Sequence, residues 1–154
     1  MIISDKVKKG ITHVLVAEIY HFIAAILAGV LIYLLFGQLT LSFLTFMISF
    51  FVDVDHVLDY LFAEGFKVDV ISFFSGAFFG KWKKIVLPFH AWEYVLILLI
   101  LFWVWGNPLF AAIAVALFSH YSVDFLTNKV TKPAYFLLYR ISVGFDIKKI
   151  SACS

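Results

Sequence analysis

Histidines and aspartates stand at the ends of the apolar segments of this chain, where they are suited to binding metal ions. His120 and Asp124 are four residues apart, so on a helix both side chains can reach one ion. A second patch combines imidazole with carboxylate oxygen, a ligand set that suits zinc or manganese, and it contains Asp53, Asp55, His56 and Asp59. We interpret Asp55 and His56 as ligands and Asp59 as a solvated helix end.

Further imidazoles and carboxylates belong to the first and third apolar runs. His13 stands at a predicted helix start, and we expect it to face the site. His90 also stands at a helix start, and Glu93 follows one turn later as a metal ligand, an acceptor for a histidine ring, or a general base on metal-bound water. Glu18 and His21 lie deeper in the first run, and we interpret them as a buried hydrogen-bonded pair.

The composition indicates a membrane protein. Of the 154 residues, 64% are hydrophobic and 14% are charged, and the mean hydropathy is +1.02. A membrane-spanning helix needs about 20 mostly apolar residues. The sequence therefore predicts a polytopic, all-α fold of one domain, residues 1–154, with four spans: Thr12 to Phe36, Leu39 to Leu61, Phe89 to Gly106 and Pro108 to Thr127.

The basic residues predict how these spans are oriented. All 12 lysines and arginines lie before the first span, between the second and third, or after the fourth. Lysine and arginine are enriched in cytoplasmic loops. The two other connections carry no charge and predict tight turns, so we expect two helical hairpins in the cell membrane with both termini in the cytoplasm. The histidines and aspartates then lie at the cytoplasmic face.

Two segments on that side are too short or too mixed to span. Residues 68–80 form an apolar run of about 13 residues, and residues 133–145 mix aromatic side chains with Arg140. We predict that both form short interfacial pieces on the cytoplasmic side and cover the site.

The order of the motifs resembles a known family. Thr12-His13, Asp53-Val-Asp-His56, His90 and Ser119-His120-Tyr-Ser-Val-Asp124 are similar to the pattern of the inner-membrane metal-dependent hydrolases related to the LexA-regulated membrane hydrolases. That family is distantly similar to zinc-dependent phospholipases C and to fungal single-strand nucleases. The chain departs from the pattern at Val52 and Phe89, where the family has proline and threonine. The resemblance implies a site of one to three divalent ions on His13, Asp53, Asp55, His56, His90, His120 and Asp124. We expect zinc first and manganese as the alternative, and the departures from the pattern favour one or two ions over three.

These residues favour a membrane-bound hydrolase that uses metal-activated water on a phosphoester of a lipid or isoprenoid. Asp53 and Glu93 are the candidate catalytic residues, and Lys84 and Arg140 are candidate contacts for the substrate phosphate at headgroup depth. An ion or proton-coupled carrier and a scaffold with structural metal are the alternatives. A net charge of +2 gives no reason to expect nucleic acid, and the single Cys153 excludes an internal disulfide.

Overall fold

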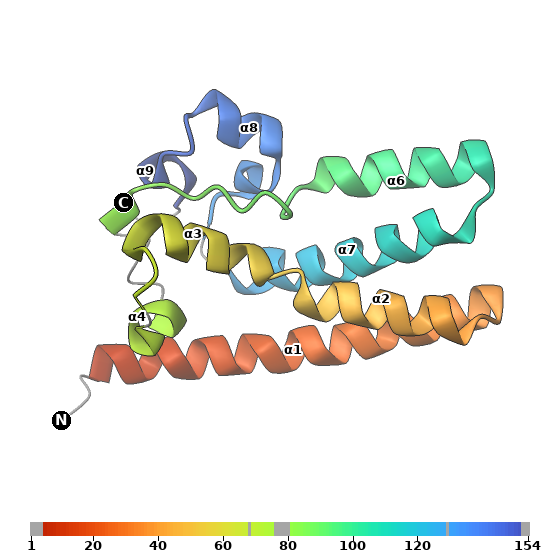
Figure 1. The fold of residues 1–154 in the computed structure, drawn as a ribbon, viewed down its shortest axis with the longest axis horizontal. Helices are drawn as coiled ribbons and strands as arrows, with labels where there is room; N and C mark the ends of the chain where they lie inside the picture. Colours follow the sequence, from red (N-terminus) through yellow and green to blue (C-terminus); the bar gives the residue numbers. More distant parts are fainter. Residues whose placement is uncertain (1–4, 68, 76–80, 129, 152–154) are drawn as a thin grey trace.

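Two helical hairpins lie side by side in the computed structural model, which describes residues 5–67, 69–75, 81–128 and 130–151 (Figure 1). The first hairpin joins α1 (Asp5–Phe36) to α2 (Leu39–Phe51), which α3 (Val54–Glu64) continues. The second joins α6 (Trp92–Trp105) to α7 (Pro108–Thr127). Both hairpin turns lie at one end of the molecule, and the beginning of α1 lies at the other end (Figure 1). The predicted pairing of helices into two hairpins is therefore confirmed.

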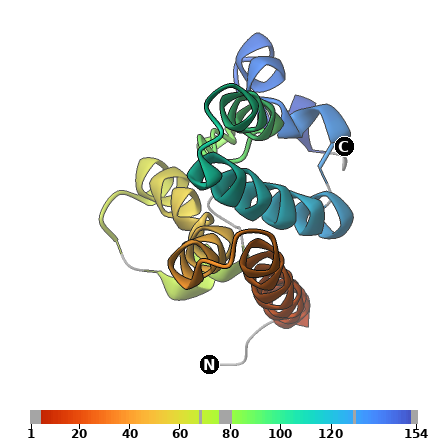
Figure 2. The same cartoon turned by 90° about the vertical axis from the view of Figure 1, so that its right-hand side faces the viewer.

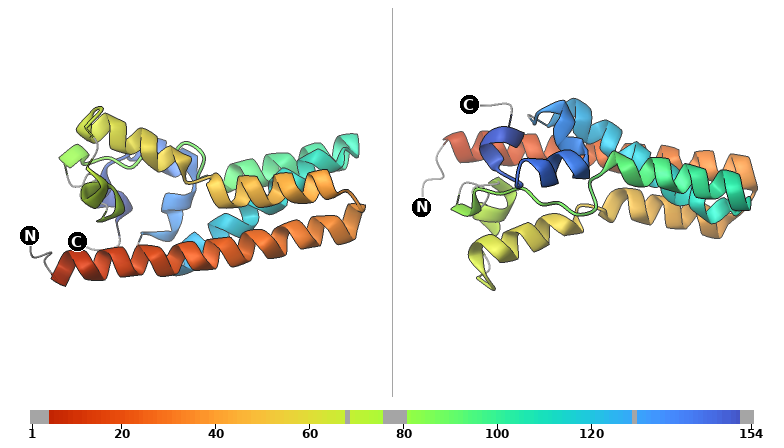
Figure 3. Two further views of the ribbon diagram at one scale, coloured as in Figure 1. Left: turned by 60° about the horizontal axis from the view of Figure 1, so that its bottom comes forward. Right: turned by 90° about the horizontal axis from the view of Figure 1, so that it is seen from above.

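Shorter elements gather at the end opposite the turns, as two further views show (Figure 3). They are α4 (Val70–Ser75), the 3-10 helix η1 (Lys132–Tyr135), α8 (Leu137–Ser142) and α9 (Ile147–Ile150). The predicted piece over 68–80 is a six-residue helix in its described part, and residues 68 and 76–80 lie outside the description. The segment 133–145 is divided because Phe136 is extended and Gly144 has a φ of +66°.

Helix α7 is the centre of the bundle, because it contacts α1, α2 and α6 (Figure 2). Its buried positions include four small residues: Ala111, Ala112, Ala114 and Ala116. Small side chains let helices approach closely, which is how apolar helices associate where hydrophobic burial gives no driving force. The Ser119 hydroxyl donates to the Ala24 carbonyl at 3.0 Å and so ties α7 to α1.

Helices α1 and α2 approach closely at Gly29. The Ser42 hydroxyl donates to the Gly29 carbonyl at 2.7 Å. A Cβ atom at position 29 would lie 3.0 Å from the Ser42 carbonyl oxygen and 3.6 Å from Cβ of Phe46. The close packing of α1 against α2 therefore requires glycine, which has no side chain, at position 29.

Three helical segments are long and apolar enough to cross a membrane: Val14–Phe36, Leu39–Glu64 and Pro108–Thr127. The predicted span from Phe89 to Gly106 is shorter than expected, because α6 has only 14 residues. A helix of this length rises about 21 Å, against about 30 Å of hydrocarbon. The residues before α6 are not helical because Phe89 lies in a turn and Ala91 is extended, with φ −143° and ψ 125°.

The outer surface of the hairpins is apolar. Leu34 and Trp103, for example, are 75% and 85% exposed. Large exposed apolar surfaces are rare on soluble monomers. This surface fits an environment of lipid chains.

We expect Gly29→Leu to destabilise the protein by about 1–3 kcal/mol, because the added side chain must push α1 and α2 apart. Thermal unfolding in detergent micelles, followed by circular dichroism, measures the effect. Val30→Leu is the matched control, since Val30 is 48% exposed on the same helix. Equal melting temperatures for the two variants would contradict the close contact.

Candidate metal centre

The junction between α2 and α3 brings Asp53 to the centre of the bundle end. Helix α2 ends at Phe51 and α3 begins at Val54, with no proline at the break. In a continuous helix the Asp53 amide would donate to the Ser49 carbonyl, but that carbonyl also faces Nδ1 of His120 at 2.8 Å. A side chain that inserts into the helical hydrogen-bond ladder is a common cause of a sharp bend. His120 therefore stabilises the break that turns Asp53 toward it.

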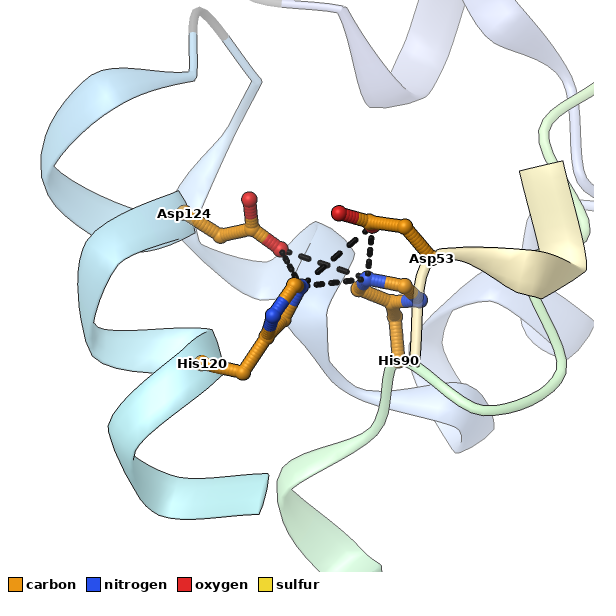
Figure 4. A group of neighbouring side chains, drawn as sticks. All are labelled: Asp53, His90, His120 and Asp124. Carbon is orange, nitrogen blue, oxygen red and sulfur yellow. Dashed lines mark hydrogen bonds and ion pairs between the residues drawn. The ribbon is translucent and has the colours of Figure 1, made fainter. Parts of the chain in front are cut away.

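Four side chains meet here, and Figure 4 shows how they converge: Asp53, His90, His120 and Asp124. Nε2 of His90 and Nε2 of His120 lie 3.2 Å apart. Oδ1 of Asp53 lies 3.0 Å and 3.3 Å from these two nitrogens, and Oδ2 of Asp124 lies 3.3 Å and 3.4 Å from them. Ligand atoms about 2.0–2.1 Å from a tetrahedral ion such as Zn²⁺ are separated by about 3.3–3.4 Å. The four atoms are therefore spaced to hold one small divalent ion.

Both histidine rings direct Nε2 into this cluster. The Ser49 carbonyl can only accept a hydrogen bond, so Nδ1 of His120 carries the proton there. Nδ1 of His90 donates to Oδ2 of Asp55 at 2.9 Å. A neutral imidazole that donates from Nδ1 has a lone pair on Nε2. Metal-binding histidines are usually oriented by such a bond from the second ring nitrogen.

A proton competes with a metal ion for this cluster. Burial by itself lowers the pKa of His90, but its hydrogen bonds to Asp124, Asp53 and Asp55 outweigh burial and raise the pKa well above its ordinary value. A divalent ion must displace that proton before it can bind. Metal affinity therefore falls as the pH falls.

A second group of candidate ligands shares Asp53 with the first and consists of Glu18, His21 and Asp53. His21 is 3% exposed, and neither ring nitrogen has a hydrogen-bond partner among the described residues. Its Nδ1 lies 3.6 Å from Oδ2 of Asp53, and its Nε2 lies 3.4 Å from Oδ1 of Asp124. The predicted hydrogen bond between Glu18 and His21 is therefore wrong, because His21 turns to the aspartates instead.

The loop before α6 is held by carboxylates of α3. Asp55 and Asp59 are both buried, at 0% and 1% exposure. Oδ2 of Asp55 accepts from the Phe89 amide at 2.9 Å, and Oδ2 of Asp59 accepts from the Val86 amide at 2.9 Å. Asp59 is thus not the solvated helix end that we predicted, because the loop covers it and binds it. The two carboxylates fix the loop that carries His90.

His56 borders the cluster on its more exposed side. A third group of candidate ligands contains Asp53, Asp55, His56 and His90. Nε2 of His56 lies 3.3 Å from Oδ1 of Asp53, and the two side chains are 29% and 27% exposed. In the cluster of four, by contrast, His90, His120 and Asp124 are buried. Solvent therefore reaches the candidate ligands at His56 and Asp53.

The remaining predicted site residues have other surroundings. His13 lies in α1, but its side chain is outside the description. Oε1 of Glu93 accepts from the Leu138 amide at 3.0 Å, and Glu93 belongs to none of the candidate-ligand groups found in the described chain. Lys84 is exposed and forms an isolated antiparallel bridge with Asp146. A catalytic role for Glu93 stays a prediction.

Sequence reasoning left His21 out of the site. A usable signal was present, because an ionisable residue inside an apolar helix usually has a functional partner. His21 also follows His13 by eight residues, which places both near the same face of one helix.

No family model, curated protein or solved structure matches this chain. The resemblance to membrane hydrolases therefore rests on the sequence motifs. The geometry adds a buried cluster of histidines and aspartates that can hold a metal ion.

We expect His120→Ala to abolish metal retention, because it removes one of four converging ligand atoms. Asp55→Asn should weaken metal affinity about 10–100-fold, because Asp55 orients His90 without belonging to the tetrahedral set. Elemental analysis and a competition titration with a chelating dye measure both effects.

Ser122→Ala is the control for these variants. Ser122 lies on α7, and its hydroxyl donates to the Phe118 carbonyl one turn earlier. Metal retained at the same affinity by His120→Ala and Ser122→Ala would reject the cluster as a metal site.

Proposed function

We propose that this chain is a membrane-bound, divalent-metal-dependent hydrolase that acts on a phosphoester. The observation that carries the proposal is a cavity of about 230 Å³ against the cluster, whose wall includes His56, His90 and Asp124. Structural metal sites are closed by four protein ligands, whereas catalytic sites keep one position open to substrate. The four converging side chains could fill a tetrahedral site by themselves, so the catalytic alternative requires a fifth position, which the cavity beside His90 and Asp124 could supply.

The site has the carboxylates needed for two neighbouring ions. Asp53 and Asp124 each direct one oxygen toward His90 and His120 and the other toward His21. Only Asp53 belongs both to the cluster and to the candidate-ligand group of Glu18 and His21. A carboxylate shared in this way could serve two ions about 3.5–4 Å apart, which together would activate water and stabilise charge on a phosphoryl oxygen. We therefore propose a dinuclear centre, with zinc or manganese as the ions to test.

The protein residues around the ions have separate roles in this proposal. Asp55 fixes the orientation of the His90 ring through the 2.9 Å bond to Nδ1. His56 lines the cavity and its side chain is 29% exposed, which places its ring beside the space where a leaving oxygen would lie. The motif order that resembles membrane hydrolases supports the same reaction class.

A membrane location is supported by the three long apolar segments and the exposed apolar surface of the hairpins. Among the described residues, the buried ionisable side chains lie away from the hairpin turns. Together with the positive-inside pattern of the sequence, this supports a site at headgroup depth on the cytoplasmic side. Substrates at that depth include lipid and isoprenoid phosphates.

A carrier is less well supported. It requires ionisable or polar side chains that continue across the membrane. Residues 108–119 of α7 contain no ionisable side chain, and they cover about 18 Å of helix. Thr45, a buried polar residue of α2, donates to the Leu41 carbonyl at 2.8 Å.

We expect the purified protein loaded with zinc or manganese to release phosphate from lipid or isoprenoid phosphates, and to lose turnover after chelation. His21→Ala should lower the metal content from two ions to one and reduce turnover about 100-fold or more, because one of the two ions is lost. Phosphate release and elemental analysis measure these effects. Full turnover in His21→Ala, or in chelated protein, would contradict the proposal.

The orientation can be tested with the single Cys153. We expect a membrane-impermeant maleimide to label Cys153 in inverted membrane vesicles and not in intact cells, because the C-terminus is predicted to be cytoplasmic. In a Cys153→Ser background, Gln38→Cys should show the opposite pattern. Labelling of both positions from the same side would reject the hairpin topology.

A further inference from the structure

The cavity beside the candidate metal centre contains the only arginine of the chain. Arg140 lies in α8, is 2% exposed, and shares the cavity wall with Tyr135 and Asp124. Its Nε and Nη2 atoms have no hydrogen-bond partner among the described residues. A buried guanidinium is costly when its donors are unsatisfied. An acceptor bound at the Arg140 wall of the cavity would offset this cost if it came within hydrogen-bond distance of the two donors.

Nearby carboxylates balance the charge of Arg140 without satisfying these two donors. Burial lowers the pKa of Arg140, whereas Asp55 and Glu93 raise it. Oδ2 of Asp55 pairs with His90, and Oε1 of Glu93 accepts from the Leu138 amide at the start of α8. The other oxygen of each carboxylate has no hydrogen-bond partner among the described residues, and neither oxygen bonds to Arg140. Glu93 thereby fixes the short helix that carries Arg140. The planar guanidinium fork matches an anion with two accessible oxygens, such as a phosphoryl group.

Tyr135 offers a second donor on the same wall. Tyr135 is 5% exposed, and its hydroxyl has no hydrogen-bond partner among the described residues. Burial and the charge of Asp124 raise the pKa of Tyr135, although Asn128 acts in the opposite direction. The hydroxyl therefore stays protonated at neutral pH and can donate to an anion.

We propose that Arg140 and Tyr135 form a receptor for the phosphoryl group of a phosphate monoester, an inference that rests on the proposed hydrolase function. The wall of the cavity of about 230 Å³ contains His90 and Asp124 as well as Arg140 and Tyr135. Sites that enclose a drug-sized ligand measure about 300–1,000 Å³. The cavity is therefore smaller than a site for a drug-sized ligand and large enough to admit a phosphoryl group.

The receptor defines what the reaction consumes and releases. Water adds its hydroxyl to phosphorus, the bond between phosphorus and the ester oxygen breaks, and the remaining proton goes to that oxygen. The products are an alcohol and inorganic phosphate. The guanidinium could hold two phosphoryl oxygens in the cavity that His90 and Asp124 also line.

The test is the binding of inorganic phosphate to metal-loaded, full-length protein in detergent, measured by calorimetry. We expect Arg140→Gln to weaken phosphate binding at least tenfold and to leave the metal content unchanged. Arg140→Lys should recover part of the affinity, because it restores the charge without the fork. Lys148→Gln removes the same charge from an exposed position and should bind phosphate like the wild type. Equal phosphate affinity in Arg140→Gln and the wild type would overturn the receptor.

A second measurement does not depend on the variants folding. Phenylglyoxal modifies arginine, and this chain has one, so mass spectrometry reads Arg140 alone. We expect inorganic phosphate to protect Arg140 in the wild type, whereas chloride at equal ionic strength should not. Equal modification rates with and without phosphate would overturn the receptor.

Turnover separates this inference from the function on which it rests. Arg140-dependent phosphate binding without hydrolysis of any phosphoester, monoester or diester, would retain the receptor and reject the hydrolase. Hydrolysis that is unchanged in Arg140→Gln would reject the receptor and retain the hydrolase. Stronger protection of Arg140 by phosphatidic acid in nanodiscs than by glycerol phosphate would identify a lipid headgroup as the source of the phosphoryl group, and the reverse would identify a soluble ester.

Discussion

Two imidazole nitrogens that face each other at 3.2 Å impose the main constraint on this protein. Each ring donates from Nδ1, His120 to a backbone carbonyl and His90 to a carboxylate, so both Nε2 lone pairs point to the same place. Lone pairs held this closely repel unless a cation or a proton lies between them. The aspartates on either side supply negative charge that favours either occupant, a proton or a metal cation.

The helices are regular near the hairpin turns, whereas the end that holds the two histidines contains a helix break and a loop. Near the hairpin turns, the helices are joined by small residues and by hydroxyl-to-carbonyl bonds such as that from Ser42 to Gly29. At the other end, the α2–α3 break and the loop before α6 bring Asp53 and His90 to α7. Breaks of this kind expose backbone groups, and the buried carboxylates of Asp55 and Asp59 bind the loop amides. Asp55 and Asp59 therefore satisfy backbone amides of the loop and also hold the loop that carries His90 in place.

Much of this arrangement could be predicted from composition and spacing. The long uncharged runs predicted the helices of the two hairpins. The i, i+4 spacing predicted that His120 and Asp124 share one face of a helix. The break between α2 and α3 could not be predicted, because it depends on a hydrogen bond between Ser49 and a residue 71 positions away. The shortened α6, the burial of Asp59 and the turn of His21 toward the aspartates likewise depend on tertiary contacts. Arg140 was recognisable as a cation, but its burial beside a cavity was not.

The Ser49 carbonyl makes the shape of the backbone and the tautomer of a ligand interdependent. Straightening α2 into α3 would return that carbonyl to the Asp53 amide and would withdraw the acceptor that keeps the proton on Nδ1 of His120. The bend between α2 and α3 and the ring orientation of His120 are therefore coupled through one carbonyl oxygen.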